Sequence, residues 1–119
     1  MQPEIQGVGI DLVEIRRIRD LAQRFGERFL KRVFSESELA YSLSFNDPYP
    51  HLACRFAAKE ALVKATGILE TPFREISVET VKGAPALKVE GRLREDLLVS
   101  LSHTEDYAVA IVIKKGEGG

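Results

Sequence analysis

The sequence predicts an α+β protein in which a mostly antiparallel sheet packs against one long helix. Apolar residues with helical spacing fill most of the first half of the chain, whereas the second half is rich in β-branched residues separated by turn-forming segments. No internal repeat and no low-complexity segment interrupts this order. Because helices and strands are segregated along the chain, the α+β class is expected.

The chain is predicted to begin with a strand over residues 5–12, followed by a helix. Gly7 and Gly9 within this strand indicate a close backbone approach or a bulge. Gly26 is expected to break or bend the helix that follows. The residues spaced by three and four, as on one helix face, are Ile15, Ile18, Ala22, Phe25 and Phe29.

Two further helices are predicted before the middle of the chain. Ser35 and Glu38 have the spacing of a capping box, so one helix begins at Ser35 and runs toward Phe45. After a loop over residues 46–50, helix-forming residues extend from 51 to 65, and Gly67 suits a left-handed C-terminal cap. On this helix Lys59 is expected to be solvated. The residues that share another face are Ala53, Phe56, Ala57, Glu60, Val63 and Lys64.

The second half is predicted to be mostly strand. Strands are expected over residues 76–81 and 86–90, around a turn at 82–85, and a short helix over 92–97. A terminal hairpin follows, with strands over 98–102 and 107–113, and a frayed tail from 114 to 119.

The charge of the chain is unevenly distributed. Its 119 residues, which we interpret as one domain over 1–119, carry a formal net charge of −1. Seven basic and two acidic residues lie between Arg16 and Arg32, so this segment has five excess positive charges and the remainder carries −6. Such a segment indicates an acidic partner that docks at one place, although a solvated helix face has the same pattern.

The composition predicts a soluble, cytoplasmic protein. A single cysteine cannot form an internal disulfide, no signal peptide is evident, and no apolar run approaches the roughly 20 residues of a membrane span. A domain of this size closes a deep cleft with difficulty, so an enzymatic site would be shared between subunits.

Several side chains could carry chemistry, and each also has a structural interpretation. Asp11 lies where the first strand gives way to a helix and could simply cap it. Glu60 and Lys64 could form an i,i+4 ion pair, or hold a metal ion and a phosphate respectively. His103 could be a hydrogen-bonded turn residue. His51 and Cys54 do not make a zinc site, because no further cysteine is available.

Three segments match one family in order and in approximate separation. They are residues 7–15 (GVGIDLVEI), 55–67 (RFAAKEALVKATG) and 99–104 (VSLSHT). Together they resemble the holo-[acyl-carrier-protein] synthase family, the short single-domain 4′-phosphopantetheinyl transferases. The resemblance implies an enzyme that moves the 4′-phosphopantetheine arm of coenzyme A onto a serine of an acyl carrier protein and releases adenosine 3′,5′-bisphosphate.

The resemblance also implies roles for particular residues. Asp11 and Glu60 match the Mg²⁺ ligands of the family, and Lys64 matches the lysine that contacts the phosphates of coenzyme A. Glu60 is the expected acceptor of the serine proton, directly or through water, with Asp11 through water as the alternative. The remaining residues that match the coenzyme A site are His103, against the nucleotide portion, and Arg55, Gly67 and Pro85.

The same resemblance implies a binding partner for the basic segment between Arg16 and Arg32. Arg17 matches a family arginine that docks the acidic helix of acyl carrier protein, and Arg24 and Arg28 are expected to add contacts. Short family members are homotrimers with active sites between subunits. Two other functions stay open: a catalytically silent module that binds coenzyme A or a carrier, and a nucleic-acid binder using residues 16–32, which lacks an aromatic stacking platform.

The sequence departs from the family pattern in the middle of the chain. Cys54 stands where a glycine is common, and Ile68 and Leu69 follow Gly67 where the family commonly has Gly-Thr-Gly. These differences concern the shape of the pantetheine and adenine pockets.

Overall fold

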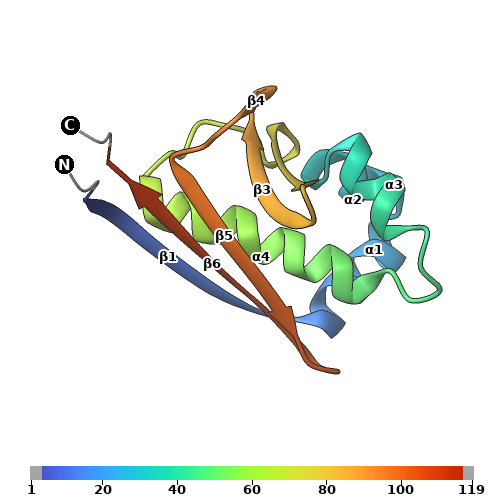
Figure 1. The fold of residues 1–119 in the computed structure, drawn as a ribbon. Coiled ribbons are helices and arrows are strands. Elements are labelled where there is room, and N and C mark those ends of the chain that lie inside the picture. The colour runs from blue at the N-terminus through green and yellow to red at the C-terminus, as the bar shows by residue number, and fades with distance from the viewer. Residues whose placement is uncertain (1–3, 117–119) are drawn as a thin grey trace.

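The computed structural model describes residues 4–116, which form two antiparallel sheets and a layer of helices (Figure 1). The elements are, in order, β1 (Ile5–Glu14), α1 (Ile15–Phe25), α2 (Glu27–Val33), α3 (Glu36–Ser42), α4 (Tyr49–Thr66), the 3-10 helix η1 (Phe73–Glu75), β2 (Ile76–Val81), β3 (Ala84–Val89), β4 (Arg92–Leu93), β5 (Leu97–His103) and β6 (Tyr107–Lys115). The predicted α+β class with antiparallel strands and a long central helix is confirmed.

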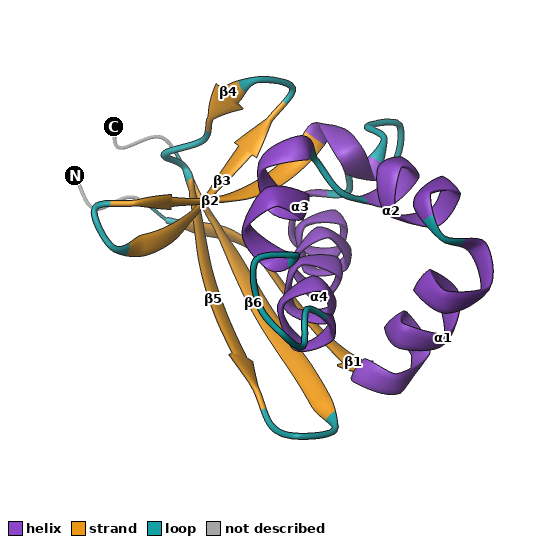
Figure 2. Ribbon diagram, turned by 90° about the vertical axis from the view of Figure 1, so that its right-hand side faces the viewer, coloured by secondary structure: helices purple, strands orange, loops and turns teal. Residues whose placement is uncertain are grey.

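The larger sheet has the strand order β1-β6-β5, so β1 and β5 are its edges. Ala110 in the middle of β6 pairs with Asp11 on one side and Leu101 on the other. The smaller sheet has the order β2-β3-β4. Figure 2 shows the α-helices gathered on one side of the larger sheet, and no other element of the described residues covers the opposite face.

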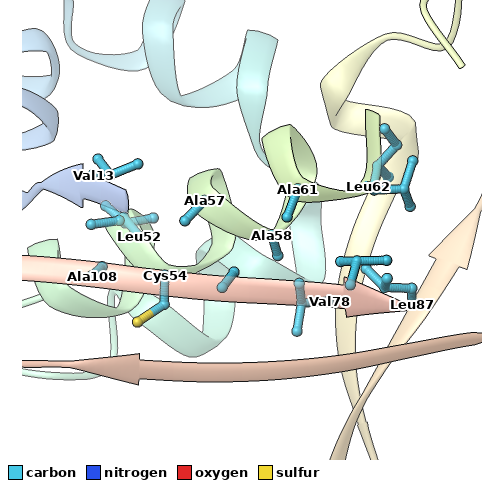
Figure 3. Close-up of a cluster of buried hydrophobic side chains, with 14 of the residues drawn as sticks. Val13, Leu52, Cys54, Ala57, Ala58, Ala61, Leu62, Val78, Leu87 and Ala108 are labelled. Carbon is cyan, nitrogen blue, oxygen red and sulfur yellow. The ribbon is translucent and has the colours of Figure 1, made fainter. Parts of the chain in front are cut away.

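Helix α4 lies directly on β1 and β6, because both surfaces present small residues. A Cβ atom at Gly9 would lie 1.9 Å from the carbonyl oxygen of Ala61, and one at Gly7 equally close to the carbonyl oxygen of Ala65. The close approach predicted from these glycines is therefore confirmed. Alanines of α4 occupy the centre of the resulting core, as Figure 3 shows for Ala57, Ala58 and Ala61.

The side of α4 that faces α3 and β2 contains a buried ion pair. Lys59 is fully buried, and its Nζ lies 2.6 Å from Oε1 of Glu38, which is also buried. The expectation that Lys59 is solvated was wrong. Burial lowers the pKa of the Lys59 ammonium, whereas the neighbouring Glu38 carboxylate raises it.

The short helix predicted over residues 92–97 was also wrong. Glu90 and Gly91 have φ values of 50° and 81°, and this left-handed turn returns the chain onto β3 as strand β4. Residues 94–96 then form a turn closed by Arg94, whose Nε and Nη2 donate to both carboxylate oxygens of Asp96.

Other boundaries shift by a few residues. Strand β1 continues past Leu12 to Glu14, α3 ends at Ser42 before reaching Phe45, and α4 begins earlier, with Pro50 in its first turn. Of the predicted frayed tail, residues 114 and 115 belong to β6 and residues 117–119 lie outside the described part. Within residues 4–116, no helix has both the length and the apolar character needed to cross a membrane.

Candidate active site

Asp11 lies inside β1, three residues before the strand ends, on the side that faces α4. Its side chain is 17% exposed, and its Oδ1 accepts a hydrogen bond from Nζ of Lys64 at 3.2 Å. Lys64 also donates to the carbonyl oxygen of Ile10 at 3.0 Å. The alternative that Asp11 caps the next helix was wrong, because the residue at the N-cap of α1 is Glu14.

Glu60 lies one turn before Lys64 on α4, so the two side chains leave the helix on the same side. The alternative of a Glu60–Lys64 ion pair was wrong, because Lys64 pairs with Asp11. Glu60 is half-buried, and no other residue within 4–116 forms a side-chain hydrogen bond or ion pair with it. We call Asp11, Glu60 and Lys64 the carboxylate cluster.

The carboxylate cluster suits Mg²⁺ better than a softer metal. Within residues 4–116, no three histidine, cysteine or carboxylate side chains gather in a group that could hold a metal ion by themselves. Mg²⁺ needs no such cage, because it commonly uses one or two carboxylates together with waters and substrate phosphates. Two carboxylates on separate elements, one of them without a protein partner, match that requirement.

A second candidate region is a pocket of about 260 Å³ between α3, α4, β5 and the turn that joins β2 to β3. Three residues predicted to contact coenzyme A meet there: Arg55, Pro85 and His103. We call it the basic pocket. The other residues that line it are Tyr41, His51, Cys54, Val78, Thr80, Gly83, Leu101 and Ser102. A larger hollow of about 640 Å³ lies elsewhere, between α2, α3 and the smaller sheet, and contains none of the predicted site residues.

Arg55 gives the basic pocket a buried positive charge. Its guanidinium carbon lies 4.4 Å from the centre of the Tyr41 ring, and Nη1 donates to the carbonyl oxygen of His51 at 3.1 Å. Its Nε is buried and has no hydrogen-bond partner among residues 4–116. A buried cation with a spare donor is suited to an anionic ligand, since an unpaired buried donor is costly.

Aromatic rings surround this charge. The His51 ring stacks on Phe45 with a centroid distance of 3.8 Å, and the His103 ring lies 6.1 Å from His51. Desolvation lowers the pKa of His51, and Arg55 and His103 lower it further, whereas Asp47 raises it. Aromatic surfaces beside cationic groups are suited to a ligand that carries both a planar base and phosphate.

The carboxylate cluster and the basic pocket lie on opposite sides of α4. Arg55 and Lys64 are nine residues apart, which is about two and a half helical turns. Asp11 is on one edge strand of the larger sheet and His103 is on the other. Gly67 caps α4 with a left-handed φ of 75°, as predicted, and it follows Arg55 by roughly 18 Å of helix. The structure therefore divides the predicted coenzyme A residues into two groups.

The three predicted docking arginines are exposed on α1 and α2. The guanidinium carbon of Arg17 lies 6.0 Å from the centre of the Phe56 ring, and Phe56 is one turn before Glu60 on α4. Arg17 is thus brought toward the carboxylate cluster. Arg24 lies over Phe25 in its own helix at 5.2 Å, and Arg28 is on α2.

Sequence reasoning missed two contributions to these regions. Tyr41 and His51 line the basic pocket, yet the sequence suggested only a rejected zinc site for His51. The buried partner of Lys59 was also missed, because the capping-box spacing assigned Glu38 only to the start of a helix. Glu38 lies 21 residues before Lys59, so no local sequence pattern indicated that the two side chains form an ion pair.

Comparisons with known proteins agree with this architecture. The model of the 4′-phosphopantetheinyl transferase superfamily matches residues 7–112. The chain is 41% identical over 111 residues to a holo-[acyl-carrier-protein] synthase of Thermodesulfovibrio yellowstonii, covering 92% of this chain and 97% of that protein. A holo-[acyl-carrier-protein] synthase of Chlamydia trachomatis is 44% identical over 115 residues, covering 90% of this chain and 97% of that protein.

A solved structure gives the same result at the level of the fold. A holo-(acyl-carrier-protein) synthase of Bacillus anthracis, crystallised in complex with CoA (3′,5′-ADP), superposes with a TM-score of 0.79 and 31% identity. The match covers 95% of this chain and 98% of that chain. The chain therefore belongs to the 4′-phosphopantetheinyl transferase superfamily. Within that superfamily it is an enzyme of the holo-[acyl-carrier-protein] synthase type.

Proposed function

We propose that this protein transfers the 4′-phosphopantetheine group of coenzyme A to a serine of apo acyl carrier protein, with Mg²⁺, and releases adenosine 3′,5′-bisphosphate. The observation that carries the proposal is the carboxylate cluster, in which Asp11 and Lys64 are in contact and Glu60 lies one turn away. These groups combine the donors for a hard cation with a cation for phosphate.

Each residue of the carboxylate cluster has a role in this reaction. The serine oxygen forms a bond to the phosphorus that carries pantetheine, and the electrons of the broken P–O bond leave with adenosine 3′,5′-bisphosphate. Glu60 accepts the serine proton, directly or through water. Asp11 and Glu60 would hold Mg²⁺, which when bound neutralises the pyrophosphate charge. The charge of Lys64 is balanced by Asp11. Two of its three N–H groups donate to Asp11 and to the carbonyl oxygen of Ile10, so the third can donate to a phosphate oxygen.

The basic pocket is proposed to hold the nucleotide part of coenzyme A. Arg55 and His103 supply donors for phosphate, and the exposed Pro85 also lines the pocket. Gly67, at the far end of α4, is proposed to contact the ligand on the side of Lys64. Because α4 separates the basic pocket from the carboxylate cluster, a single copy of the chain is poorly arranged to use both at once.

We propose that a homotrimer resolves this separation, with the carboxylate cluster of one copy beside the basic pocket of the next. The uncovered face of the larger sheet supports self-association, because it exposes apolar side chains that a monomer rarely leaves to water. Four of these residues on β1 and β5 are Val8 at 55%, Ile10 at 59%, Leu12 at 65% and Leu98 at 50%.

Arg17, Arg24 and Arg28 are proposed to dock the acidic carrier protein, in the cytoplasm. Arg17 lies over Phe56, so a carrier bound there would present its serine near Glu60. Charged contacts of this kind act mainly on the association rate and on the register of docking, and salt weakens them.

Transfer is tested by mass spectrometry of the carrier. The purified protein is incubated with coenzyme A, Mg²⁺ and several apo acyl carrier proteins, and a mass gain equal to phosphopantetheine is expected on at least one. Omitting Mg²⁺ or adding a chelator should prevent the gain. If no carrier gains mass under any of these conditions, the proposed function is wrong.

A further inference from the structure

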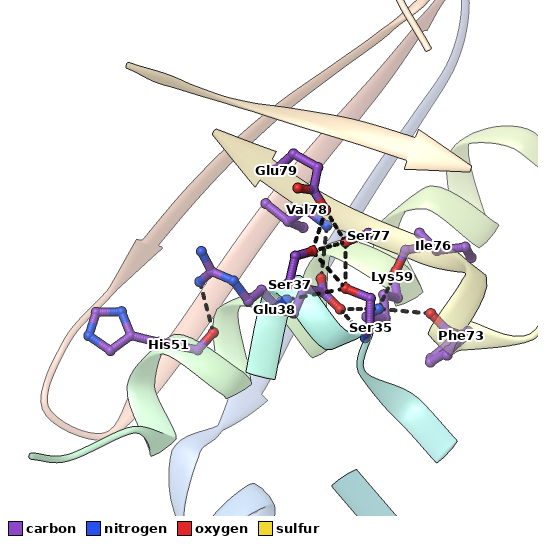
Figure 4. Close-up of polar contacts among 11 residues, drawn as sticks. Ser35, Ser37, Glu38, His51, Lys59, Phe73, Ile76, Ser77, Val78 and Glu79 are labelled. Carbon is purple, nitrogen blue, oxygen red and sulfur yellow. Dashed lines mark hydrogen bonds and ion pairs between the residues drawn. The ribbon is translucent and has the colours of Figure 1, made fainter. Parts of the chain in front are cut away.

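The side chains of Lys59 and its partner Glu38 are both fully enclosed in the described part of the chain. Nζ of Lys59 donates to Oε1 of Glu38, to the carbonyl oxygen of Phe73 at 2.8 Å and to the carbonyl oxygen of Ile76 (Figure 4). All three ammonium protons therefore have acceptors. These acceptors come from α3, η1 and β2, so the ammonium joins α4 to three other elements.

The partner of Lys59 is itself held rigidly. Oε1 of Glu38 also accepts from the backbone N–H of Ser35 at 3.0 Å, as one half of a capping box, and Oε2 accepts from the backbone N–H of Val78 at 2.8 Å. Its side chain is fully buried. A carboxylate fixed by two backbone donors is a stationary anchor for the lysine.

The anchor continues to the surface through a chain of hydroxyl groups. Ser35 Oγ lies 2.6 Å from Ser77 Oγ, and Ser37 Oγ donates to Oε2 of Glu79 at 2.6 Å. Ser77 also donates to Glu79. This outer part of the network, from Ser35 to Glu79, joins α3 to β2 and makes no hydrogen bond with the described residues of α4. It therefore offers matched controls for changes at the inner part.

Alanines of α4 pack closely on β1 and β6, and this apolar contact fixes the distance of the helix from the larger sheet. On the side that faces α3 and β2, the hydrogen bonds of Lys59 add directional restraints to the rotation of α4. A rotation of 20° about the axis would displace a side-chain atom at a radius of about 5–6 Å by roughly 2 Å. Displacements of even 1 Å can cost about 100-fold in rate.

We propose that Lys59, held by Glu38, is a positioning residue that fixes the rotation of α4 and thereby directs Glu60 and Lys64 toward Asp11. Adjacent residues of a helix diverge by about 100°, so the direction of Lys59 determines that of Glu60. The expected effect on catalysis rests on the proposed transferase function. Mg²⁺ is sensitive to such displacement because it requires nearly ideal octahedral geometry.

The test compares two variants at the anchor. Glu38→Gln is isosteric and leaves Lys59 a hydrogen-bond acceptor, and Lys59→Met removes the ammonium with little change of volume. Both are expected to lower kcat at least 10-fold and to raise the half-saturating concentration of Mg²⁺ at least 5-fold. Binding of Mn²⁺ in the presence of coenzyme A, followed by electron paramagnetic resonance without any carrier, should weaken to the same extent.

A control variant in the same hydrogen-bond network distinguishes a positioning role of Lys59 from a purely structural one. Glu79→Gln disturbs the outer hydroxyl chain and is expected to lower stability to urea while leaving Mn²⁺ binding and kcat near the wild-type values. Should Lys59→Met fail to fold, Glu38→Gln carries the test, with its folded fraction measured by circular dichroism.

Each outcome is decisive for the positioning role. Folded Glu38→Gln with wild-type Mn²⁺ affinity and kcat would overturn it, and so would an equal loss in Glu79→Gln. If the wild-type protein transfers nothing, the proposed function fails, and the comparison of Mn²⁺ affinities still decides whether Lys59 positions the carboxylate cluster.

Discussion

The contact between Asp11 and Lys64 contributes little to stability, so its position at the centre of the site needs another explanation. The Lys64 side chain is 55% exposed, and pairs with such exposure are worth about 0–1 kcal/mol. Such a pair can exchange its partner for a cation or a phosphate at low cost. The arrangement therefore favours a site that rearranges when substrate binds.

The first prediction concerns the charge of Asp11. Asp11→Asn keeps the shape of the side chain and removes one carboxylate from the site. Transfer measured by carrier mass gain is expected to fall at least about 100-fold, since changes in the outer shell of a metal site alone commonly cost 10- to 100-fold. The melting temperature should stay within a few degrees of the wild type.

Asp96→Asn is the matched control for Asp11→Asn. It breaks the bidentate contact with Arg94 in a turn far along the chain from the carboxylate cluster. Near-normal transfer is expected for this variant. Near-normal transfer by Asp11→Asn would remove Asp11 from the proposed metal site.

A second prediction at this scale concerns Glu79 and pH. Burial alone would raise the pKa of Glu79, but hydrogen bonds from Ser37 and Ser77, with Lys88 and Arg55 nearby, hold the pKa below its ordinary value. A carboxyl group with a lowered folded-state pKa adds stability above its unfolded pKa of about 4.3, and this stability is lost as the pH falls through the folded pKa.

Urea unfolding of Glu79→Gln measures this contribution. At pH 7 the variant is expected to lose about 1.5–2 kcal/mol of unfolding free energy, at the lower end of the range for hydrogen bonds to charged groups. The difference from the wild type should shrink below about pH 4. A difference that is independent of pH would show that the carboxylate charge is not responsible.

The residues of the carboxylate cluster could be selected from the sequence, but their contacts could not. Asp11, Glu60 and Lys64 stand at recognisable positions of two motifs, whereas the pairing of Lys64 with Asp11 joins residues 53 apart. Helical spacing favoured the nearer Glu60 as its partner. For the same reason the contact between Glu38 and Lys59 was not predicted, because the sequence does not indicate which side chains 21 residues apart will meet.

At the scale of elements, the site depends on how closely β1 approaches α4. Gly9 is in backbone contact with Ala61, and the next residue of β1 on that face is Asp11. The spacing of strand and helix therefore sets the distance between Asp11 and the side chains of α4. A larger residue at Gly9 would act on the site without touching any of its polar groups.

Gly9→Ala tests this spacing. The added methyl group would lie 1.9 Å from the Ala61 carbonyl oxygen, so strand or helix must move. A loss of about 3 kcal/mol in unfolding free energy is expected, at the upper end for overpacking. Transfer by the remaining folded protein should fall more than 10-fold.

Gly91→Ala is the control for Gly9→Ala. Gly91 has a φ of 81°, and no atom of residues 4–116 lies within 4 Å of an added Cβ, so only backbone strain of about 1–2 kcal/mol is expected. Its transfer activity should be unchanged. Equal activity of the two variants would show that the β1–α4 spacing does not matter.

Elements with a local signal were predictable, and those made by tertiary contact were not. The capping box at Ser35 and the left-handed cap at Gly67 are local, and both are confirmed. Residues 92–97 have polar helix formers, but the left-handed turn at Glu90 and Gly91 sends them back along β3. Strand pairing therefore overrode their helical preference.

At the scale of the whole molecule, we propose that the two halves of the site come from different copies of the chain. The basic pocket and the carboxylate cluster lie on opposite sides of α4, and the sheet beneath it exposes an apolar face between its two edges. Contact through this face would bring the edge strand β1 of one copy toward the edge strand β5 of another. A closed ring of copies would complete every site.

Subunit mixing tests this arrangement. Glu60→Gln disables the carboxylate cluster, and Arg55→Met combined with His103→Ala disables the basic pocket, so each variant alone should be inactive. After joint refolding of equal amounts, a site is intact only when one copy supplies an unaltered carboxylate cluster and its neighbour an unaltered basic pocket. Random assembly into a closed ring then restores about one quarter of the wild-type activity.

A substitution on the uncovered face of the larger sheet is the control for the subunit-mixing experiment. Ile111 lies on β6 between Ile10 and Ser100, so Ile111→Lys places a charge at the centre of the uncovered face. Light scattering should show a monomer for this variant, and adding the change to both mixed variants should abolish the recovered activity. Recovery that survives in monomers, or no recovery from intact oligomers, would mean that each chain builds its site alone.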